Sequence, residues 1–151
     1  MDRTDLHILK ILQQNARTTI KQISREVNLS PPSVTERIHR LEEAGVLLGY
    51  HAQVNPLKLS KNLIVFIGVD VVPERYATFT AFCKSSPLIL AHHRVIGIHN
   101  AMLLAALHDS SELEKLIDNL KRYGTTSSSI ILSTVFDNKP LSDITENQPD
   151  N

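Results

Sequence analysis

The sequence predicts an α+β protein in two parts, a short helical unit followed by a unit of alternating strands and helices. Up to Gly45, apolar side chains recur every three or four positions, the spacing of amphipathic helices. From Leu63 onward, short β-branched runs alternate with helical spacing. The length of 151 residues suits one ordinary domain or two small ones. The content of 42% hydrophobic and 21% charged residues is typical of a globular protein and excludes a disordered chain.

Three helices are predicted before Gly45. The first two span residues 2–14 and 19–27, and the third begins after Ser30 and ends at Glu43. Ser30 is a suitable N-cap because Pro31 and Pro32 are tolerated only in the first turn, and glycine commonly follows a helix. Three helices with a short turn between the last two have the layout of a helix-turn-helix.

The segment from Val46 to Val54 is apolar and ends in an alternating pattern, which predicts a short strand or hairpin. Turn-forming residues then continue a linker to Asn62. We therefore expect a winged-helix-like unit over residues 1–50 and a hairpin or linker over residues 51–62.

Residues 63–137 are expected to hold four strands and two helices. The first strand, Leu63–Val72, is apolar except at Asp70, which predicts burial on both faces or nearly so. The expected elements are strands at 63–72, 88–96, 101–107 and 127–136, and helices at 74–84 and from a cap at Ser110 or Ser111 to Gly124. This β-α-β-β-α-β order is that of the ferredoxin-like fold. The polar residues 138–151 are expected to form a flexible tail.

Charge and cysteine content narrow the class of function. The 16 basic and 16 acidic residues cancel, although residues 17–40 hold five basic against two acidic side chains. A bulk polyanion binder normally carries excess positive charge over the whole chain. No apolar run approaches the roughly 20 residues of a membrane span, and no secretory signal opens the chain. Cys83 alone forms neither an internal disulfide nor a cysteine zinc site. These features predict a cytoplasmic protein with no membrane attachment.

The third helix has the two faces that a DNA-reading helix needs. Val34, Ile38 and Leu41 form an apolar stripe that would hold it on a scaffold, and polar side chains of mixed length lie elsewhere. The alternative is a solvated face with intrahelical ion pairs. The candidate DNA contacts are Lys21, Ser30, Ser33, Thr35, Glu36, Arg37, His39 and Arg40.

Three motifs of the first part occur together. They read Asp2-x-x-Asp5-x-x-Ile8-Leu9, then Asn15-Ala-Arg17, then Leu29-Ser-Pro31-x-Ser33-Val34-x-x-Arg37-Ile38-x-x-Leu41-Glu42-x-x-Gly45-Val46. In this combination the chain resembles the Lrp/AsnC family of prokaryotic transcription regulators, over nearly its whole length apart from the tail. The resemblance implies double-stranded DNA as a partner and a regulatory domain that assembles into dimers, tetramers or octamers. It also implies an amino-acid effector. The alternatives are an architectural DNA-bending protein of low specificity and an amino-acid-sensing subunit without DNA binding.

The turn after the second expected strand departs from the Gly-Asp-x-Asp-Tyr pattern of amino-acid-sensing members. It reads Gly97-Ile98-His99-Asn100-Ala101 and so lacks both carboxylates and the tyrosine. Because no carboxylate pairs with an α-ammonium group, amino acids are expected to bind weakly or not at all. The effector candidates are Gly97, His99 and Asn100, and the nearest acid along the chain is Asp109.

No catalytic signature accompanies these motifs. The serine and threonine run at 125–129 has no Gly-rich phosphate loop around it, and the sequence shows no nucleophile–base motif such as Gly-x-Ser-x-Gly. His92, His93, His99 and His108 are not expected to converge on a metal ion. The sequence thus predicts no enzymatic activity, no cofactor and no metal site.

Overall fold

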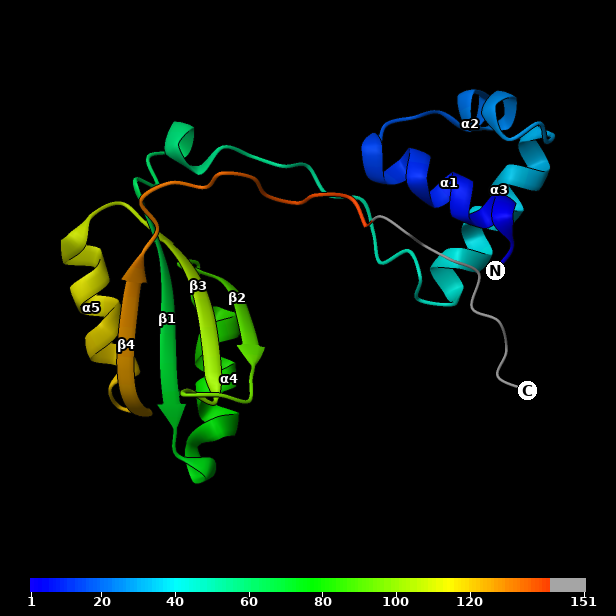
Figure 1. Ribbon diagram of the computed structural model, residues 1–151. Helices are drawn as coiled ribbons and strands as arrows, with labels where there is room; N and C mark the ends of the chain where they lie inside the picture. Colours follow the sequence, from blue (N-terminus) through cyan, green and yellow to red (C-terminus); the bar gives the residue numbers. More distant parts are fainter. Residues whose placement is uncertain (142–151) are drawn as a thin grey trace. The chain divides into compact units, whose positions relative to one another are not determined.

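The computed structural model describes residues 1–141, and the chain divides into two compact units. Among the described residues, one unit holds 1–53 with 136–141, and the other holds Val54–Val135. Figure 1 shows both units. Most of the tail expected over residues 138–151 lies outside the described residues. No helix within residues 1–141 is long and apolar enough to cross a membrane.

The first unit is formed by three helices, α1 (Arg3–Gln14), α2 (Ile20–Glu26) and α3 (Pro31–Glu43). Each begins after a residue whose side-chain oxygen accepts the third backbone N–H of the helix, namely Asp2, Thr19 and Ser30. The apolar stripes of the three helices meet in one core. The predicted helix-turn-helix is therefore confirmed.

The turn between α2 and α3 is fixed by local geometry. Asn28 has a φ of +54°, in the left-handed region that asparagine tolerates better than most residues. Ser24 Oγ donates to the carbonyl of Leu29 at 2.8 Å, and Leu29 N–H donates to the carbonyl of Ser24 at 3.1 Å. These contacts set the direction in which α3 leaves α2.

The strand or hairpin expected over Val46–Val54 is wrong. This segment contains no strand, and Leu48 is 89% exposed. Apolar alternation becomes a strand only where a second strand supplies hydrogen bonds, and within residues 1–141 none pairs with it. Its polar anchor is Tyr50, whose hydroxyl donates to Glu42 Oε1 at 2.9 Å. A short 3₁₀ helix, η1 (Pro56–Leu59), lies in the linker.

The second unit has the predicted ferredoxin-like order of elements. They are β1 (Leu63–Val71), the 3₁₀ turn η2 (Pro73–Arg75), α4 (Tyr76–Ser85), β2 (Ile89–Arg94), β3 (Ala101–Leu107), α5 (Ser110–Leu120) and β4 (Gly124–Ile130). The strands form one antiparallel sheet in the order β2-β3-β1-β4, so β2 and β4 are its edges. This is the α+β fold that the element order predicts.

Both helices of this unit cover the same face of the sheet (Figure 1). Val65, Ile67 and Val69 of β1 point to that face and are fully buried. The opposite face, which we call the open face, carries Phe66 at 46% exposure, and none of the other described elements packs over it. The expectation that β1 is buried on both faces is therefore wrong, because the two helices form a single layer.

Two predicted boundaries in this unit also need correction. The N-cap of α5 is Asp109, whose Oδ1 accepts from Glu112 N at 2.9 Å, and not Ser110 or Ser111. The last strand begins at Gly124 rather than Ser127 and ends at Ile130. It pairs with β1, and the length of β1 sets these limits. A Cβ at Gly124 would overlap the backbone of Asp70, so only glycine fits at this start.

Candidate DNA-binding helix and effector turn

The exposed side chains of α3 form a polar surface, which we call the α3 surface. Val34, Ile38 and Leu41 are buried, as their spacing predicts. The outward positions of α3 are those of the predicted contacts, Ser33, Thr35, Glu36, His39 and Arg40, and all five are exposed. Lys21 on α2 and the cap Ser30 are exposed as well.

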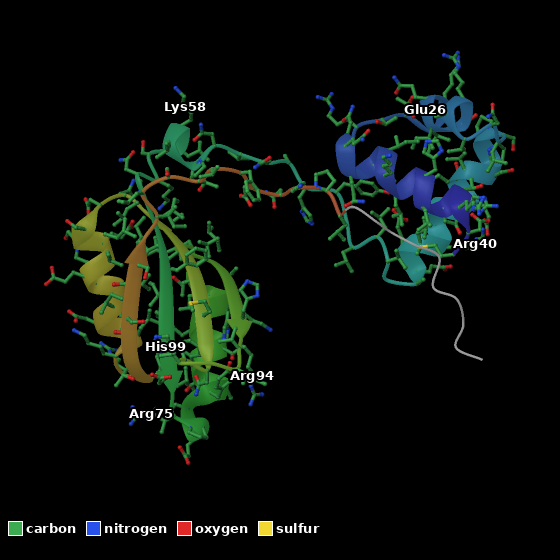
Figure 2. All side chains as sticks on the ribbon, viewed as in Figure 1. Glu26, Arg40, Lys58, Arg75, Arg94 and His99 are labelled. Carbon is green, nitrogen blue, oxygen red and sulfur yellow. The ribbon has the colours of Figure 1, made fainter. Side chains whose placement is uncertain are left out.

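These polar side chains differ in whether they have partners. Ser30 and Ser33 share a hydrogen bond at 2.8 Å, and Thr35 Oγ1 donates to the carbonyl of Pro31 at 3.1 Å. His39 Nδ1 lies 3.4 Å from Glu43 Oε2. No hydrogen bond or ion pair within residues 1–141 engages the guanidinium of Arg40, which Figure 2 shows on α3. Arg40 is therefore the cation of α3 that is available to a ligand.

Arg37 is occupied inside the helical unit. Its Nη1 donates to Asp2 Oδ2 and to Asp5 Oδ1, both at 2.7 Å. The hydrogen bonds that Arg37 donates to Asp5 and Asp2 raise its pKa. The pKa of Asp2 is lowered, first by the backbone N–H of Asp5 and then by Arg37. This guanidinium joins α3 to the capped start of α1, which gives it a positioning role.

Asn100, an effector candidate, is bonded to the sheet. Its Oδ1 accepts from Val71 N–H and its Nδ2 donates to the Val71 carbonyl, both at 2.9 Å. Val95 N–H donates to the Asn100 carbonyl at 3.1 Å and closes the turn. Gly97 at the tip is exposed, and a Cβ added there would meet no other atom within 4 Å. The amide of Asn100 is thus used within the chain.

His99, the remaining effector candidate, belongs to a polar cluster on the open face. Its Nδ1 lies 3.1 Å from Asp70 Oδ2, and its Nε2 lies 2.7 Å from Ser127 Oγ. Thr125 Oγ1 donates to Asp70 Oδ2 at 3.1 Å. The acid beside the turn is therefore Asp70, and Asp109 serves as a helix cap.

The sequence shows no nucleophile–base motif, and the cluster that brings a serine, a histidine and an aspartate together is visible only in the structure. Serine, histidine and aspartate come from three elements, so a search for a contiguous motif could not find them. The signal available in the sequence was Asp70 as the single polar residue of an apolar strand. A pocket of about 360 Å³ lies elsewhere, between α4 and β2, and includes none of the effector candidates.

Three other polar side chains of the second unit pack against its core or its aromatic rings. His92 packs edge-on against Phe79 with the ring centres 5.0 Å apart, and burial lowers its pKa. Arg94 lies over the ring of Tyr76 at 5.0 Å. Cys83 is buried in the core, which raises the pKa of its thiol to about 11. A thiol in this setting is a packing group.

A helix-turn-helix with a polar reading helix, joined to a ferredoxin-like domain, defines a two-domain DNA-binding transcriptional regulator. Residues 1–47 match the family described as winged helix-turn-helix DNA-binding, and residues 64–141 match the Lrp/AsnC ligand binding domain. The chain belongs to the Lrp/AsnC family of transcriptional regulators.

Individual relatives agree with this assignment. The chain is 34% identical over 134 residues to YezC, described as an uncharacterized HTH-type transcriptional regulator of Bacillus subtilis, which covers 89% of this chain and 95% of that protein. The structure of Bacillus subtilis LrpC is similar with a TM-score of 0.84 and 28% identity, over 90% of this chain and 97% of that one. The transcriptional regulator NMB0573 of Neisseria meningitidis was solved as an L-Met complex. Its structure is similar with a TM-score of 0.86 and 26% identity, over 93% of this chain and 96% of that one.

Proposed function

We propose that this regulator reads double-stranded DNA with the α3 surface, and that Arg40 makes the main charged contact. The observation that carries this proposal is the contrast between two arginines of one helix. Arg37 is held by Asp2 and Asp5, whereas Arg40 is exposed and unpaired among residues 1–141. Ser33, Thr35, Glu36 and His39 would supply the neighbouring hydrogen bonds in the major groove. Lys21 and Ser30 would contact phosphates at the start of α3.

The test is selection of a binding site from random-sequence duplexes, followed by fluorescence anisotropy of the selected and a scrambled duplex. Arg40→Ala should weaken binding to the selected duplex by about 1–3 kcal/mol if Arg40 contacts a base, and preference at one position should relax. If Arg40 contacts a phosphate, binding to both duplexes should weaken, and the slope of log affinity against log salt concentration should become less steep by about one. Unchanged affinity for both duplexes would refute the assignment. Equal wild-type affinity for both would favour the architectural alternative.

A second copy of the chain is proposed as the partner of the open face. Phe66 and Leu104 lie opposite each other there, with Ile64 paired to Ala106 beside them. At this end Ala106 is buried and Ile64 and Leu104 are half-buried, but Phe66 remains 46% exposed, and a symmetric dimer is the commonest way to bury such an apolar side chain. Dimers would bring two α3 helices to one DNA site, and tetramers or octamers would form from further contacts.

Sedimentation equilibrium measures this assembly. Phe66→Asp should shift the protein toward the monomer, because it places a charge in an apolar contact. Leu57→Asp is the matched control, since Leu57 is also an exposed apolar residue of the same unit but lies outside the sheet. A monomeric wild type at micromolar concentration, or equal effects of the two variants, would contradict the proposal.

We further propose that an amino-acid effector is bound weakly, if at all, through the turn at residues 97–100. Asn100 is committed to Val71, and the carboxylate of Asp70 already accepts from Thr125 and His99. Calorimetry with the twenty amino acids should show no tight binding. Tight binding of one of them, lost in His99→Ala, would overturn this view. As a regulator of a prokaryotic chromosome, the protein would act in the cytoplasm.

A further inference from the structure

We propose that Glu36 selects cytosine at one position of the DNA site, because its carboxylate accepts a hydrogen bond from the N4 amino group in the major groove. This role rests on the proposed function, since it names one base of the duplex that the α3 surface reads. An acid at this place needs a physical reason, because DNA is a polyanion.

Glu36 lies at the centre of the α3 surface. Each residue of an α-helix turns by about 100°, so it is roughly opposite the buried stripe of Val34, Ile38 and Leu41. The side chain of Glu36 is exposed. A helix that is held on its scaffold by the buried stripe therefore presents Glu36 to the groove in which it lies.

The carboxylate of Glu36 has no partner inside the described protein. No hydrogen bond or ion pair within residues 1–141 engages it, although Arg40 lies four residues further on, the spacing at which an acid and a base pair on a helix. The other two acids of α3 do have side-chain partners, in Tyr50 and His39. Glu36 is thus the acid of α3 whose oxygens are left for a ligand.

A free carboxylate at the centre of a DNA-reading helix opposes binding to DNA in general. Phosphates surround the groove with negative charge, and a carboxylate that loses its water there must regain hydrogen bonds. The chain has no excess of positive charge to offset this cost, with 16 basic and 16 acidic residues. Glu36 therefore disfavours every duplex that offers it no donor, and a repulsive group of this kind creates specificity.

The donors of the major groove restrict the choice to two bases. Cytosine N4 and adenine N6 are the amino groups on that edge of the base pairs. Adenine N6 lies between two acceptors, its own N7 and O4 of the paired thymine, and both repel a carboxylate. Cytosine N4 has an acceptor on one side alone, O6 of the paired guanine. A carboxylate therefore fits cytosine better than adenine.

Exchange of Glu36 for glutamine gives a test with a direction. A carboxamide presents a donor and an acceptor together, which match N7 and N6 of adenine. Glu36→Gln keeps the size of the side chain and removes its charge. It should change the preferred base from cytosine to adenine at one position, and it should bind a scrambled duplex more tightly than the wild type does. Glu36→Ala should lose the preference for cytosine without gaining another.

The experiment uses the full chain and sites selected from random-sequence duplexes. Selection is repeated with Glu36→Gln and with the matched control Glu26→Gln, which should select the wild-type site. Glu26 ends α2, is exposed and has no partner within residues 1–141, so its exchange removes the same charge outside α3 (Figure 2). Fluorescence anisotropy with each base pair at the affected position should show that the wild type favours cytosine by about 5- to 150-fold.

A modified base tests the contact at the level of one atom. Replacing the selected cytosine by 2-pyrimidinone removes the N4 amino group and keeps the rest of the ring. The wild type should lose affinity for this duplex, whereas Glu36→Ala should bind both duplexes equally, because it has no acceptor there. Circular dichroism spectra matching the wild type show that a variant is folded.

Three results would overturn this role of Glu36 even where Arg40→Ala confirms that α3 reads DNA. They are selection of the wild-type site by Glu36→Gln, equal changes in Glu36→Gln and Glu26→Gln, or the same loss of affinity for the 2-pyrimidinone duplex in Glu36→Ala as in the wild type. The second result would mean that charge alone acts. A wild type that selects no site would contradict both this role and the proposed function.

Discussion

Replacing Arg37 by alanine should destabilise the helical unit. The side chain of Arg37 is 22% exposed and that of Asp5 is 11% exposed, so their bond is partly shielded from water. A hydrogen bond to a charged group is worth about 1.5–3 kcal/mol, whereas the pair with the 53% exposed Asp2 adds about 0–1 kcal/mol at most. The expected loss in the free energy of unfolding is about 2 kcal/mol. For a unit of this size that lowers Tm by about 10 °C.

The loss should depend on pH with a defined sign. The folded pKa of Asp2 is lowered below its ordinary value of 3.8, so its contribution to stability is present above that value. As the pH falls through the lowered pKa, the carboxylate is protonated and the ion pair with Arg37 is lost. The part of the difference between the wild type and Arg37→Ala that comes from Asp2, about 1 kcal/mol at most, should therefore be present near neutral pH and be lost below about pH 3.8.

Thermal unfolding followed by circular dichroism measures the effect, and hydrogen exchange of α1 amides assigns it to the helical unit. Arg40→Ala is the matched control: it lies on the same helix, has no partner within residues 1–141, and should change stability by no more than about 0.5 kcal/mol. Wild-type stability of Arg37→Ala would refute this role of Arg37, and a loss that is the same in acid as at neutral pH would exclude a contribution from Asp2. The two variants should show opposite profiles, one losing stability and the other losing DNA affinity.

Three further outcomes are expected. Asn100→Asp removes the donor to the Val71 carbonyl, so chemical denaturation should show the second unit weakened by about 1–3 kcal/mol; full stability would contradict the role of the bond. Because burial raises the pKa of Cys83 to about 11, iodoacetamide should label it at pH 8 only after unfolding, and rapid labelling of the native protein would refute this. Burial and then the bond to Glu42 raise the pKa of Tyr50 to about 12; NMR titration of labelled tyrosine should show it lowered in Glu42→Gln, and an unchanged value would exclude that bond.

Local patterns were sufficient for most of the fold. The caps at Asp2, Thr19 and Ser30 are sequence signals because a short polar side chain binds the N–H three residues on, and those helices begin where expected. The last strand was predicted too far toward the C-terminus, because the apolar residues after Ile130 resemble a strand more than Gly124 to Ser129 do. Its true limits come from pairing with β1, which is a property of the sheet and not of the segment.

The candidate sites were less predictable, because their partners are distant in sequence. Arg37 is separated by 32 residues from Asp5, and nothing in the helical period indicates that the two side chains meet. His99 is separated by 29 residues from Asp70 and by 28 from Ser127. The exposed positions of α3 were predictable, since they are the positions of the helix that do not belong to its buried apolar stripe.

The amide of Asn100 works as one more peptide group at the end of β1. It presents a donor and an acceptor to Val71, as a neighbouring strand would, and so extends the sheet by a rung built from a side chain. A carboxylate has no donor and would place an oxygen against the Val71 carbonyl. An aspartate at position 100 would supply a negative charge that can bind an α-ammonium group. An asparagine instead completes the hydrogen bonding of the sheet, and one residue cannot do both. Because this chain has an asparagine at position 100, the turn is held by its own hydrogen bonds without a ligand, and it lacks a carboxylate that could contact one.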